Sequence, residues 1–139
     1  MFKKIIVAMD FSELSLHAAR AAAKLAAGLA AQVTLVHVIT PGAEYGSLGL
    51  SKDNLRAGIE GKLKEVIATL DSKASIDWGV VDGDPANELA TFASRWDGDL
   101  IAIGSNARSG IGRVLLGSVA AALVRSAKVP VLVLGPEST

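Results

Sequence analysis

The sequence predicts an α/β fold in which a doubly wound parallel sheet forms the middle of three layers. The first observation is that short apolar runs alternate with longer stretches of helical period. The second is that the first of these runs, residues 5–9, is continuously apolar, as expected for a strand covered on both faces. Five strands and four helices alternate strictly along the chain. Right-handed crossovers then give the three layers, and we expect the strand order 3-2-1-4-5.

The first half of the chain contains two predicted strands and two predicted helices. Residues 5–9 form the first strand, and Ser12 is placed to cap the helix that follows. The apolar stripe expected on that helix consists of Leu14, Ala18, Ala22, Leu25 and Leu29. Residues 32–39 form the second strand. Residues 41–50, with three glycines, are either a lid or, in the favoured interpretation, a surface loop.

The next helix is predicted over residues 51–70. Its buried side is expected to hold Leu55, Ile59, Leu63, Val66, Ile67 and Leu70, while Gly58 and Gly61 weaken it. Residues 75–81 form the third strand, and Asp84-Pro85 is a specific helix start signal. The buried face of the helix that begins there is expected to hold Leu89, Ala90, Phe92 and Ala93.

The last part of the chain begins with a predicted turn at residues 97–99. The fourth strand follows over residues 100–103, the fourth helix over 118–127 and the fifth strand over 129–134. With half of its 139 residues apolar, the chain is expected to form one domain over residues 1–139.

Composition argues against several classes of function. The 14 basic and 14 acidic side chains balance, so no strong field favours nucleic acid or an anionic membrane surface. The absence of cysteine removes disulfides, thiol catalysis and thiolate zinc sites, and it fits a reducing compartment. The apolar run at residues 5–9 is too short for a signal peptide or a membrane span. We therefore expect a cytoplasmic protein.

Two segments are expected to face one crevice, because ligands of such sheets bind beyond the carboxyl ends of the strands where the strand order reverses. One comprises residues 8–12, after the first strand, and the other residues 104–118, after the fourth. The second segment has glycines, Arg108 and Arg113, and a helix start at Gly117-Ser118, which suit a phosphate. A purely structural interpretation of this segment has equal weight. In it the glycines form turns, Ser118 caps a helix and the arginines are exposed to solvent.

Three titratable residues stand out. Asp10 ends a central strand, where its carboxylate can accept hydrogen bonds from a ribose hydroxyl or an adenine amino group. Capping the first helix together with Ser12 is an equally weighted alternative. His37 lies within the second strand and is interpreted as a packed sheet residue rather than a base, and His17 as a surface residue.

Over essentially its whole length the sequence resembles a single-domain universal stress protein. The resemblance rests on residues 4–12, 35–38, 83–85 and above all 104–133. Nucleotide-binding members have a glycine, two residues, a second glycine, nine residues, and then a glycine followed by serine or threonine. Gly104 and Gly117-Ser118 stand at those spacings, but Ala107 replaces the second glycine. If that position needs a positive φ, alanine costs about 1–2 kcal/mol, or roughly ten- to thirtyfold in affinity.

The resemblance implies a fold like that of the adenine nucleotide alpha hydrolases and a bound ATP, with Mg²⁺ on its phosphates. It implies a base near Asp10 and Val38, a ribose near Gly104 and Asn106, and phosphates at Ala107 and the start of the fourth helix. The expected binding residues are Ala8, Met9, Asp10, Val38, Ile103, Gly104, Asn106, Ala107, Arg108, Gly117, Ser118, Val119 and Ala120. No metal ligand is expected from the protein itself.

The function that follows is a nucleotide-dependent switch or sensor in a stress response. The alternatives are a family member that binds no nucleotide and a slow ATPase; no general base accompanies the glycine-bearing segment. A phosphoacceptor domain would need clustered acidic residues near the first strand, where Asp10 stands alone. A Rossmann turn or a P-loop is excluded, because residues 8–12 hold no glycine and no lysine follows Gly117. The resemblance also implies a homodimer paired through the last strand, and residues 129–134 fit this, because an apolar edge strand left uncovered would be an aggregation hazard.

Overall fold

The computed structural model describes residues 2–41, 51–70, 73–105 and 116–136. The elements run in the order β1 (Lys4–Ala8), α1 (Glu13–Leu29), β2 (Gln32–Ile39), α3 (Lys52–Thr69), β3 (Ser75–Asp82), α4 (Pro85–Arg95), β4 (Leu100–Gly104), α5 (Ser118–Ser126) and β5 (Val131–Leu134). The predicted alternation of strands and helices is confirmed. The largest shift in a strand start is in β5, which begins at Val131 rather than at Val129.

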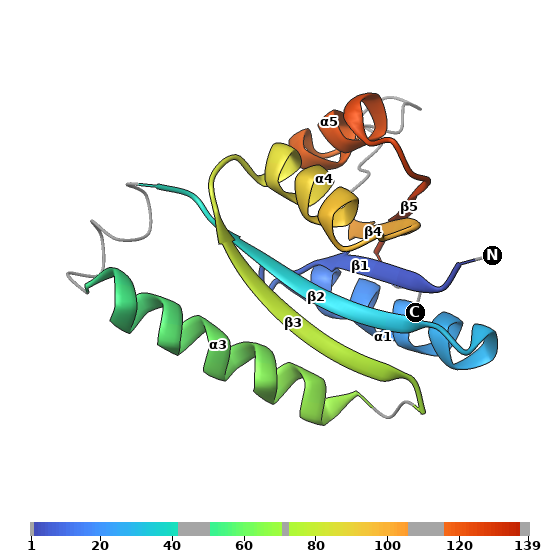
Figure 1. Cartoon of the computed structure of the whole chain (residues 1–139), viewed down its shortest axis with the longest axis horizontal. Coiled ribbons are helices and arrows are strands. Elements are labelled where there is room, and N and C mark those ends of the chain that lie inside the picture. The colour runs from blue at the N-terminus through green and yellow to red at the C-terminus, as the bar shows by residue number, and fades with distance from the viewer. Residues whose placement is uncertain (1, 42–50, 71–72, 106–115, 137–139) are drawn as a thin grey trace.

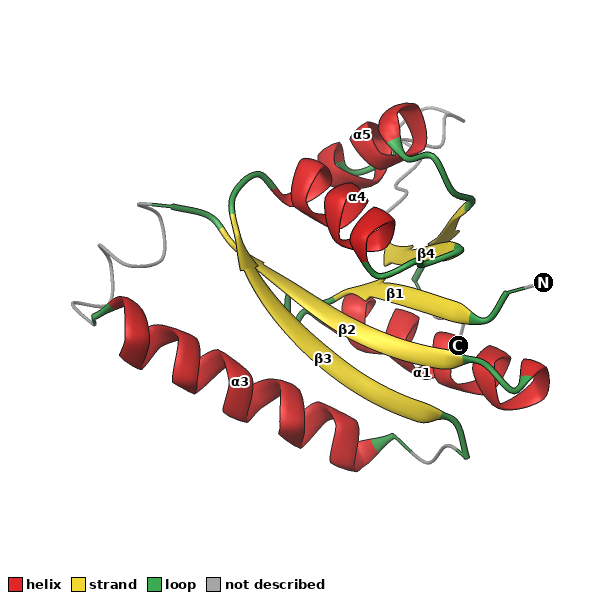
Figure 2. Cartoon of the chain, viewed as in Figure 1, coloured by secondary structure: helices red, strands yellow, loops and turns green. Residues whose placement is uncertain are grey.

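The five strands form one parallel sheet in the order β3-β2-β1-β4-β5, as predicted. Helices α4 and α5 lie on one face of this sheet, and α1 and α3 lie on the other (Figure 1). The strands thus form the middle layer of a three-layer sandwich (Figure 2). Strand order reverses at β1, whose neighbours are β2 and β4.

Both faces of β1 and β4 are buried along most of their length, which explains why residues 5–8 and 100–103 are continuously apolar. Along β1, Ile5 and Val7 belong to the core under α1 and α3, whereas Ile6 belongs to the core under α4 and α5. All three side chains have no exposed surface. Burial on this scale contributes about 1.5–3 kcal/mol for each large aliphatic side chain.

Small residues form most of the buried face of α1, so this helix can lie close to the sheet. Its buried residues are Ser15, Ala18, Ala19, Ala22, Ala23 and Ala26. The prediction that Leu29 belongs to this stripe is wrong, since its side chain is 45% exposed. Leu29 is the last residue of the helix, and the chain leaves it through Ala30 in a left-handed conformation. The stripe therefore ends one turn earlier than the spacing suggests.

Three helices begin with side-chain caps that satisfy otherwise unpaired amides. Ser12, Ser51 and Asp84 each accept a hydrogen bond from the backbone N–H three residues later. The predicted start signal at Asp84-Pro85 is confirmed. Helix α5 differs, because its N-cap is Gly117 and no side chain caps it. Ser118 is its first helical residue, so the interpretation of Ser118 as a cap is wrong.

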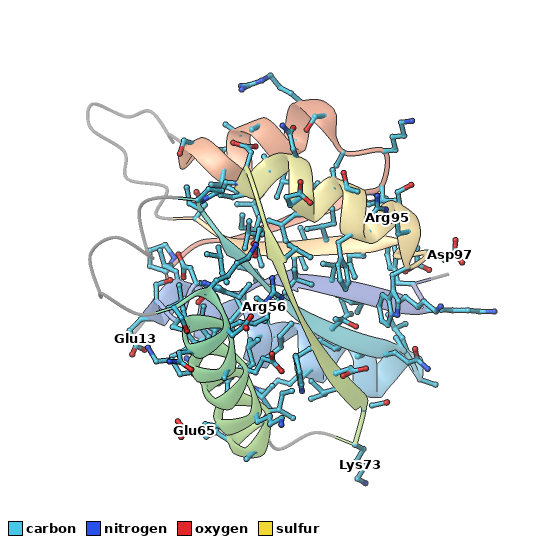
Figure 3. The ribbon with its side chains drawn as sticks, turned by 60° about the vertical axis from the view of Figure 1, so that its left-hand side comes forward. Glu13, Arg56, Glu65, Lys73, Arg95 and Asp97 are labelled. Carbon is cyan, nitrogen blue, oxygen red and sulfur yellow. The ribbon has the colours of Figure 1, made fainter. Side chains whose placement is uncertain are left out.

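Polar contacts fix the start of α3 to the end of β3. Arg56 reaches from α3 to β3 (Figure 3) and donates to the Val80 carbonyl oxygen at 2.9 Å and to Asp82 Oδ1 at 2.7 Å. Lys52 Nζ lies 2.9 Å from the other oxygen of Asp82. These bonds hold the outer edge of the sheet, where β3 has only β2 as a neighbour.

Two glycine-to-alanine substitutions should change stability in opposite directions. A Cβ at Gly61, within α3, meets no atom within 4 Å, whereas a Cβ at Gly104 would lie 2.6 Å from the Leu14 carbonyl oxygen. Gly61→Ala should raise the free energy of unfolding by about 0.5–1 kcal/mol, because alanine favours the helix. Gly104→Ala should lower the free energy of unfolding by about 1–3 kcal/mol, because the backbone of Leu14 or of Gly104 must move to make room for the new methyl group. Urea denaturation followed by circular dichroism measures the free energy of unfolding of both variants. A Gly104→Ala variant that is as stable as Gly61→Ala would contradict the close contact at Gly104.

Candidate functional site

A cavity of about 440 Å³ opens at the carboxyl ends of β1, β2 and β4 and reaches the first turn of α5. Its walls are Ala8, Met9, Asp10, Ser12, Leu14, Ser15, Val36, His37, Val38, Thr40, Pro85, Leu89, Ile103, Gly104, Ser105, Gly117, Ser118, Val119 and Ala120. The volume lies within the range of about 300–1,000 Å³ that is usual for small-molecule sites. Most of the lining is apolar, with a few polar groups between.

The topology of the sheet explains where this cavity lies. After β1 the chain passes into α1 on one face, and after β4 it continues toward α5 on the other face. Because β1 and β4 are adjacent, their carboxyl ends are left between two diverging connections. The segment after β1 and the described ends of the segment 104–118 therefore line one cavity, as predicted.

All the predicted binding residues that the structure describes line this cavity. They come from β1 and its exit (Ala8, Met9, Asp10), β2 (Val38), β4 (Ile103, Gly104) and the start of α5 (Gly117, Ser118, Val119, Ala120). Asn106, Ala107 and Arg108 lie outside the described residues, as does almost all of segment 41–50. That the predicted binding residues, described or not, bind a ligand stays a prediction.

Gly104 is required by packing, whatever the cavity binds. A side chain there would run into the backbone of Leu14, in the first turn of α1. This close approach brings the end of β4 against the start of α1, and both Gly104 and Leu14 line the cavity. The first glycine of the predicted motif therefore has a structural reason of its own.

Asp10 supports the cap of α1 and also faces the cavity. Its Oδ1 atom accepts from the Ser12 backbone N–H at 2.9 Å and from the Ser12 hydroxyl at 2.5 Å. Ser12 Oγ in turn accepts from the Ser15 backbone N–H at 3.2 Å. The two roles that the sequence left open for Asp10 are compatible in this arrangement, because Ser12 is the cap and Asp10 orients it.

The Asp10 carboxyl is held in its ionised form. Partial burial by itself would raise the pKa of Asp10, but hydrogen bonds from the side chain and backbone of Ser12 and from Ser15 outweigh it, so the pKa lies below its ordinary value. An ionised carboxylate only accepts hydrogen bonds. The Asp10 end of the cavity therefore suits a ligand group that donates, such as a hydroxyl or an amino group.

Backbone and side-chain bonds join β1 to β2 at the floor of the cavity. The Met9 N–H donates to the Val36 carbonyl oxygen at 2.9 Å, and His37 Nδ1 lies 2.8 Å from the Met9 carbonyl oxygen. Since a carbonyl only accepts, Nδ1 carries the proton in this bond. His37 is buried, which agrees with its predicted role as a packed sheet residue. His17 is half-buried rather than on the surface.

The turn after Met9 contains a strained residue. Phe11 has φ 66°, a conformation that bulky residues rarely adopt. The centroids of the Phe11 and His37 rings lie 5.2 Å apart. The ammonium group of Lys62, a residue of α3, lies 5.5 Å from the centroid of the Phe11 ring. These contacts hold a turn that places Asp10 at the cavity.

The start of α5 contributes backbone donors. Gly117 N–H donates to the buried Ser105 hydroxyl oxygen at 2.8 Å. Intrahelical bonding begins with the Ala121 N–H, which donates to the Gly117 carbonyl oxygen. The amides of Ser118, Val119 and Ala120 precede that first bond, so they belong to the part of a helix that attracts an anion.

Charge is unevenly distributed around the cavity. Among the described lining residues, Asp10 is the only one with a carboxylate, and no lysine or arginine is present. One end of the cavity thus has a carboxylate, at the exit of β1, and the other end has the N-terminus of α5. An anionic group is attracted to the second end and repelled by the first.

Sequence analysis did not assign several residues of the cavity wall. These are Leu14, Ser15, Val36, His37, Thr40, Pro85, Leu89 and Ser105. Four of them, Leu14, Val36, Pro85 and Leu89, are apolar, and sequence periodicity does not distinguish such residues from others of the same kind. Ser105 was the one with a usable signal, since it directly follows Gly104 in the predicted phosphate segment.

No three histidine, cysteine or acidic side chains among the described residues are grouped so that they could hold a metal ion. Likewise, none of the helices in the described ranges is both long and apolar enough to cross a membrane.

Known proteins resemble this chain over nearly its whole length. The chain is 35% identical to the universal stress protein MJ0531 of Methanocaldococcus jannaschii, over 96% of this chain and 82% of that protein. Among solved structures, that of the protein MJ0577 superposes with a TM-score of 0.80 at 28% identity, covering 100% and 99% of the two chains. A universal stress protein in complex with cAMP gives a TM-score of 0.72 at 26% identity, covering 98% of each chain.

A family model describes the same relationship from sequence alone. It is the model of the universal stress protein family, and it matches residues 1–135. Together with the sheet order and the relatives above, this match establishes that the chain belongs to the universal stress protein family.

Proposed function

We propose that this chain binds an adenine nucleotide in the cavity between β1, β4 and α5 and acts as a nucleotide-dependent switch or sensor in a stress response. The observation that carries the proposal is that the Asp10 segment and the start of α5 line one cavity. The related universal stress protein in complex with cAMP supports an adenine nucleotide as the class of ligand.

The charge distribution defines how the nucleotide lies. The Asp10 carboxylate accepts from a hydroxyl or amino group, so the base or ribose lies near Asp10 and Val38. The phosphates lie at the other end, near Gly117 and the amides of Ser118, Val119 and Ala120. Each amide contact with an exposed phosphate is worth about 0.3–1 kcal/mol, so several must act together.

ATP is our proposed physiological ligand, with Mg²⁺ bound through its phosphates and water. The described cavity wall offers Asp10 as its one carboxylate, at the end away from the proposed phosphates, so the ion would have few protein ligands. Such a site favours holding a nucleotide over hydrolysing it. We also propose that residues 1–139 form one domain and that the protein works in the cytoplasm, as its lack of cysteine suggests.

Titration with nucleotides tests this function. ATP with Mg²⁺ should saturate the protein, and adenosine should bind at least about tenfold more weakly, because it lacks the group that α5 attracts. Isothermal titration calorimetry measures both, with AMP, cAMP and GTP as comparisons and with Mg²⁺ omitted in a parallel series. If no adenine nucleotide saturates at millimolar concentration, the protein is a family member that binds none. Phosphate release from ATP, followed over hours, distinguishes a protein that binds ATP without hydrolysing it from a slow ATPase.

A pair of substitutions tests the placement of the phosphates. Ala107→Gly restores the motif glycine and should tighten ATP binding about tenfold if alanine strains that position. Gly117→Val puts a branched side chain at the N-cap of α5, close to Ser105, and should weaken binding by a similar factor. Binding by both variants is compared with wild type by the same titration, after circular dichroism has shown equal folding. The opposite order of affinities would contradict the proposed phosphate site.

We further propose that two copies pair through β5. This strand lies at the edge of the sheet and leaves Leu132 37% exposed, while Val131, Val133 and Leu134 are half-buried. An uncovered apolar edge is an aggregation hazard, and a second copy would cover it.

Replacing Leu132 by lysine should convert a dimer to a monomer, because a charge would be buried in the pairing surface. Leu29→Lys is the matched control, since Leu29 is also an exposed leucine, 45% exposed, but lies at the end of α1. Sedimentation velocity of the three proteins measures their mass. A monomeric wild type, or a dimer that persists in Leu132→Lys, would argue against pairing through β5.

A further inference from the structure

Ser105 occupies a junction of three elements at the wall of the cavity. It follows the last residue of β4, its backbone N–H donates to the Leu134 carbonyl oxygen of β5 at 2.9 Å, and its Oγ accepts from the Gly117 N–H of α5 at 2.8 Å. Only 3% of its surface is exposed. A buried serine with fixed backbone has little freedom to turn away from these partners.

The bond to Gly117 sets the direction of the first turn of α5. Gly117 is the N-cap of this helix, and no side chain caps it from within. The capped helices α1, α3 and α4 hold their first turns with their own serine or aspartate. In α5 the first turn is instead held by the bond from the Gly117 N–H to Ser105, which lies 12 residues earlier in the sequence. The amides of Ser118 to Ala120 are thereby held at the cavity.

The hydroxyl hydrogen of Ser105 points to a second role. Its oxygen is used as an acceptor by Gly117, and within the described part of the chain no acceptor receives the hydroxyl hydrogen. A buried hydroxyl normally finds an acceptor. Because Ser105 lines the cavity beside the start of α5, a phosphate oxygen there would accept this hydrogen.

We propose that Ser105 is a phosphate-binding and positioning residue: it fixes the N-terminus of α5 through Gly117 and donates its hydroxyl hydrogen to the phosphate next to the ribose. This inference rests on the proposed nucleotide function. It also explains why a polar residue is buried at the end of an otherwise apolar strand, Leu100 to Ile103.

Three variants of the full chain test the proposal. Ser105→Ala removes the hydroxyl, and Ser105→Thr keeps it. Ser126→Ala is the matched control, because it removes a serine hydroxyl from the other end of the same helix, where Ser126 Oγ donates to the Ala122 carbonyl oxygen at 2.7 Å. Ser126 does not line this cavity.

The first readout is hydrogen exchange of the Gly117 amide, measured by NMR without nucleotide. Exchange should be about tenfold faster in Ser105→Ala, as expected for the loss of one hydrogen bond, and close to wild type in Ser105→Thr and Ser126→Ala. Unchanged exchange in Ser105→Ala would overturn the positioning role.

The second readout is the difference between AMP and adenosine binding, measured by calorimetry. Ser105→Ala should weaken AMP about tenfold and leave adenosine within about twofold of wild type, with binding restored in Ser105→Thr. Equal weakening of both ligands would overturn the donation to phosphate, because a general loss of structure affects both. If wild type binds neither ligand, the proposed function fails, and the Gly117 exchange still decides the positioning role by itself.

Discussion

The adjacency of β1 and β4 is the constraint on which the rest of the molecule depends. Their pairing through Ile5–Leu100, Ile6–Ile101 and Val7–Ala102 places two strand ends side by side whose onward connections leave on opposite faces of the sheet. In open α/β sheets a crevice lies outside the carboxyl ends of the strands where such connections diverge. The cavity is therefore a consequence of the crossover pattern, and only its chemistry is left to individual residues. This is why a fold shared by many proteins can serve different ligands.

Those individual residues serve the structure and the cavity at the same time. The backbone of Leu14 leaves no space for a side chain at Gly104, and both residues line the cavity. Asp10 orients the cap of α1 through Ser12, and the same bonds keep its carboxylate ionised at the cavity. Substitutions at either residue change folding and any binding together.

Much of the fold could be predicted from the sequence because it depends on local patterns. Continuous apolar runs identify buried parallel strands, and Asp84-Pro85 identifies a helix start by simple backbone chemistry. What failed depends on tertiary surroundings. Leu29 has the spacing of a core residue but lies at a helix end beyond the sheet, and Ser118 looks like a cap although Gly117 has that position. The position of Ser105 after Gly104 was a usable signal, but its burial and its bond to Gly117 could not be predicted, because only the folded chain brings these residues together.

The polarity of the cavity restricts its ligands more strongly than its size does. A carboxylate held ionised at one end excludes an anion there, and the other end offers amides and a serine hydroxyl rather than a lysine or arginine among the described residues. A ligand that fits must therefore have a hydrogen-bond donor at one end and an anion at the other, with an apolar, flat or compact part between. A nucleotide has these features in this order: amino or hydroxyl groups, a base with apolar faces, and a phosphate. Each amide at the start of α5 attracts an anion with a modest free energy, which is compatible with the reversible exchange of ligand that the proposed sensor function requires.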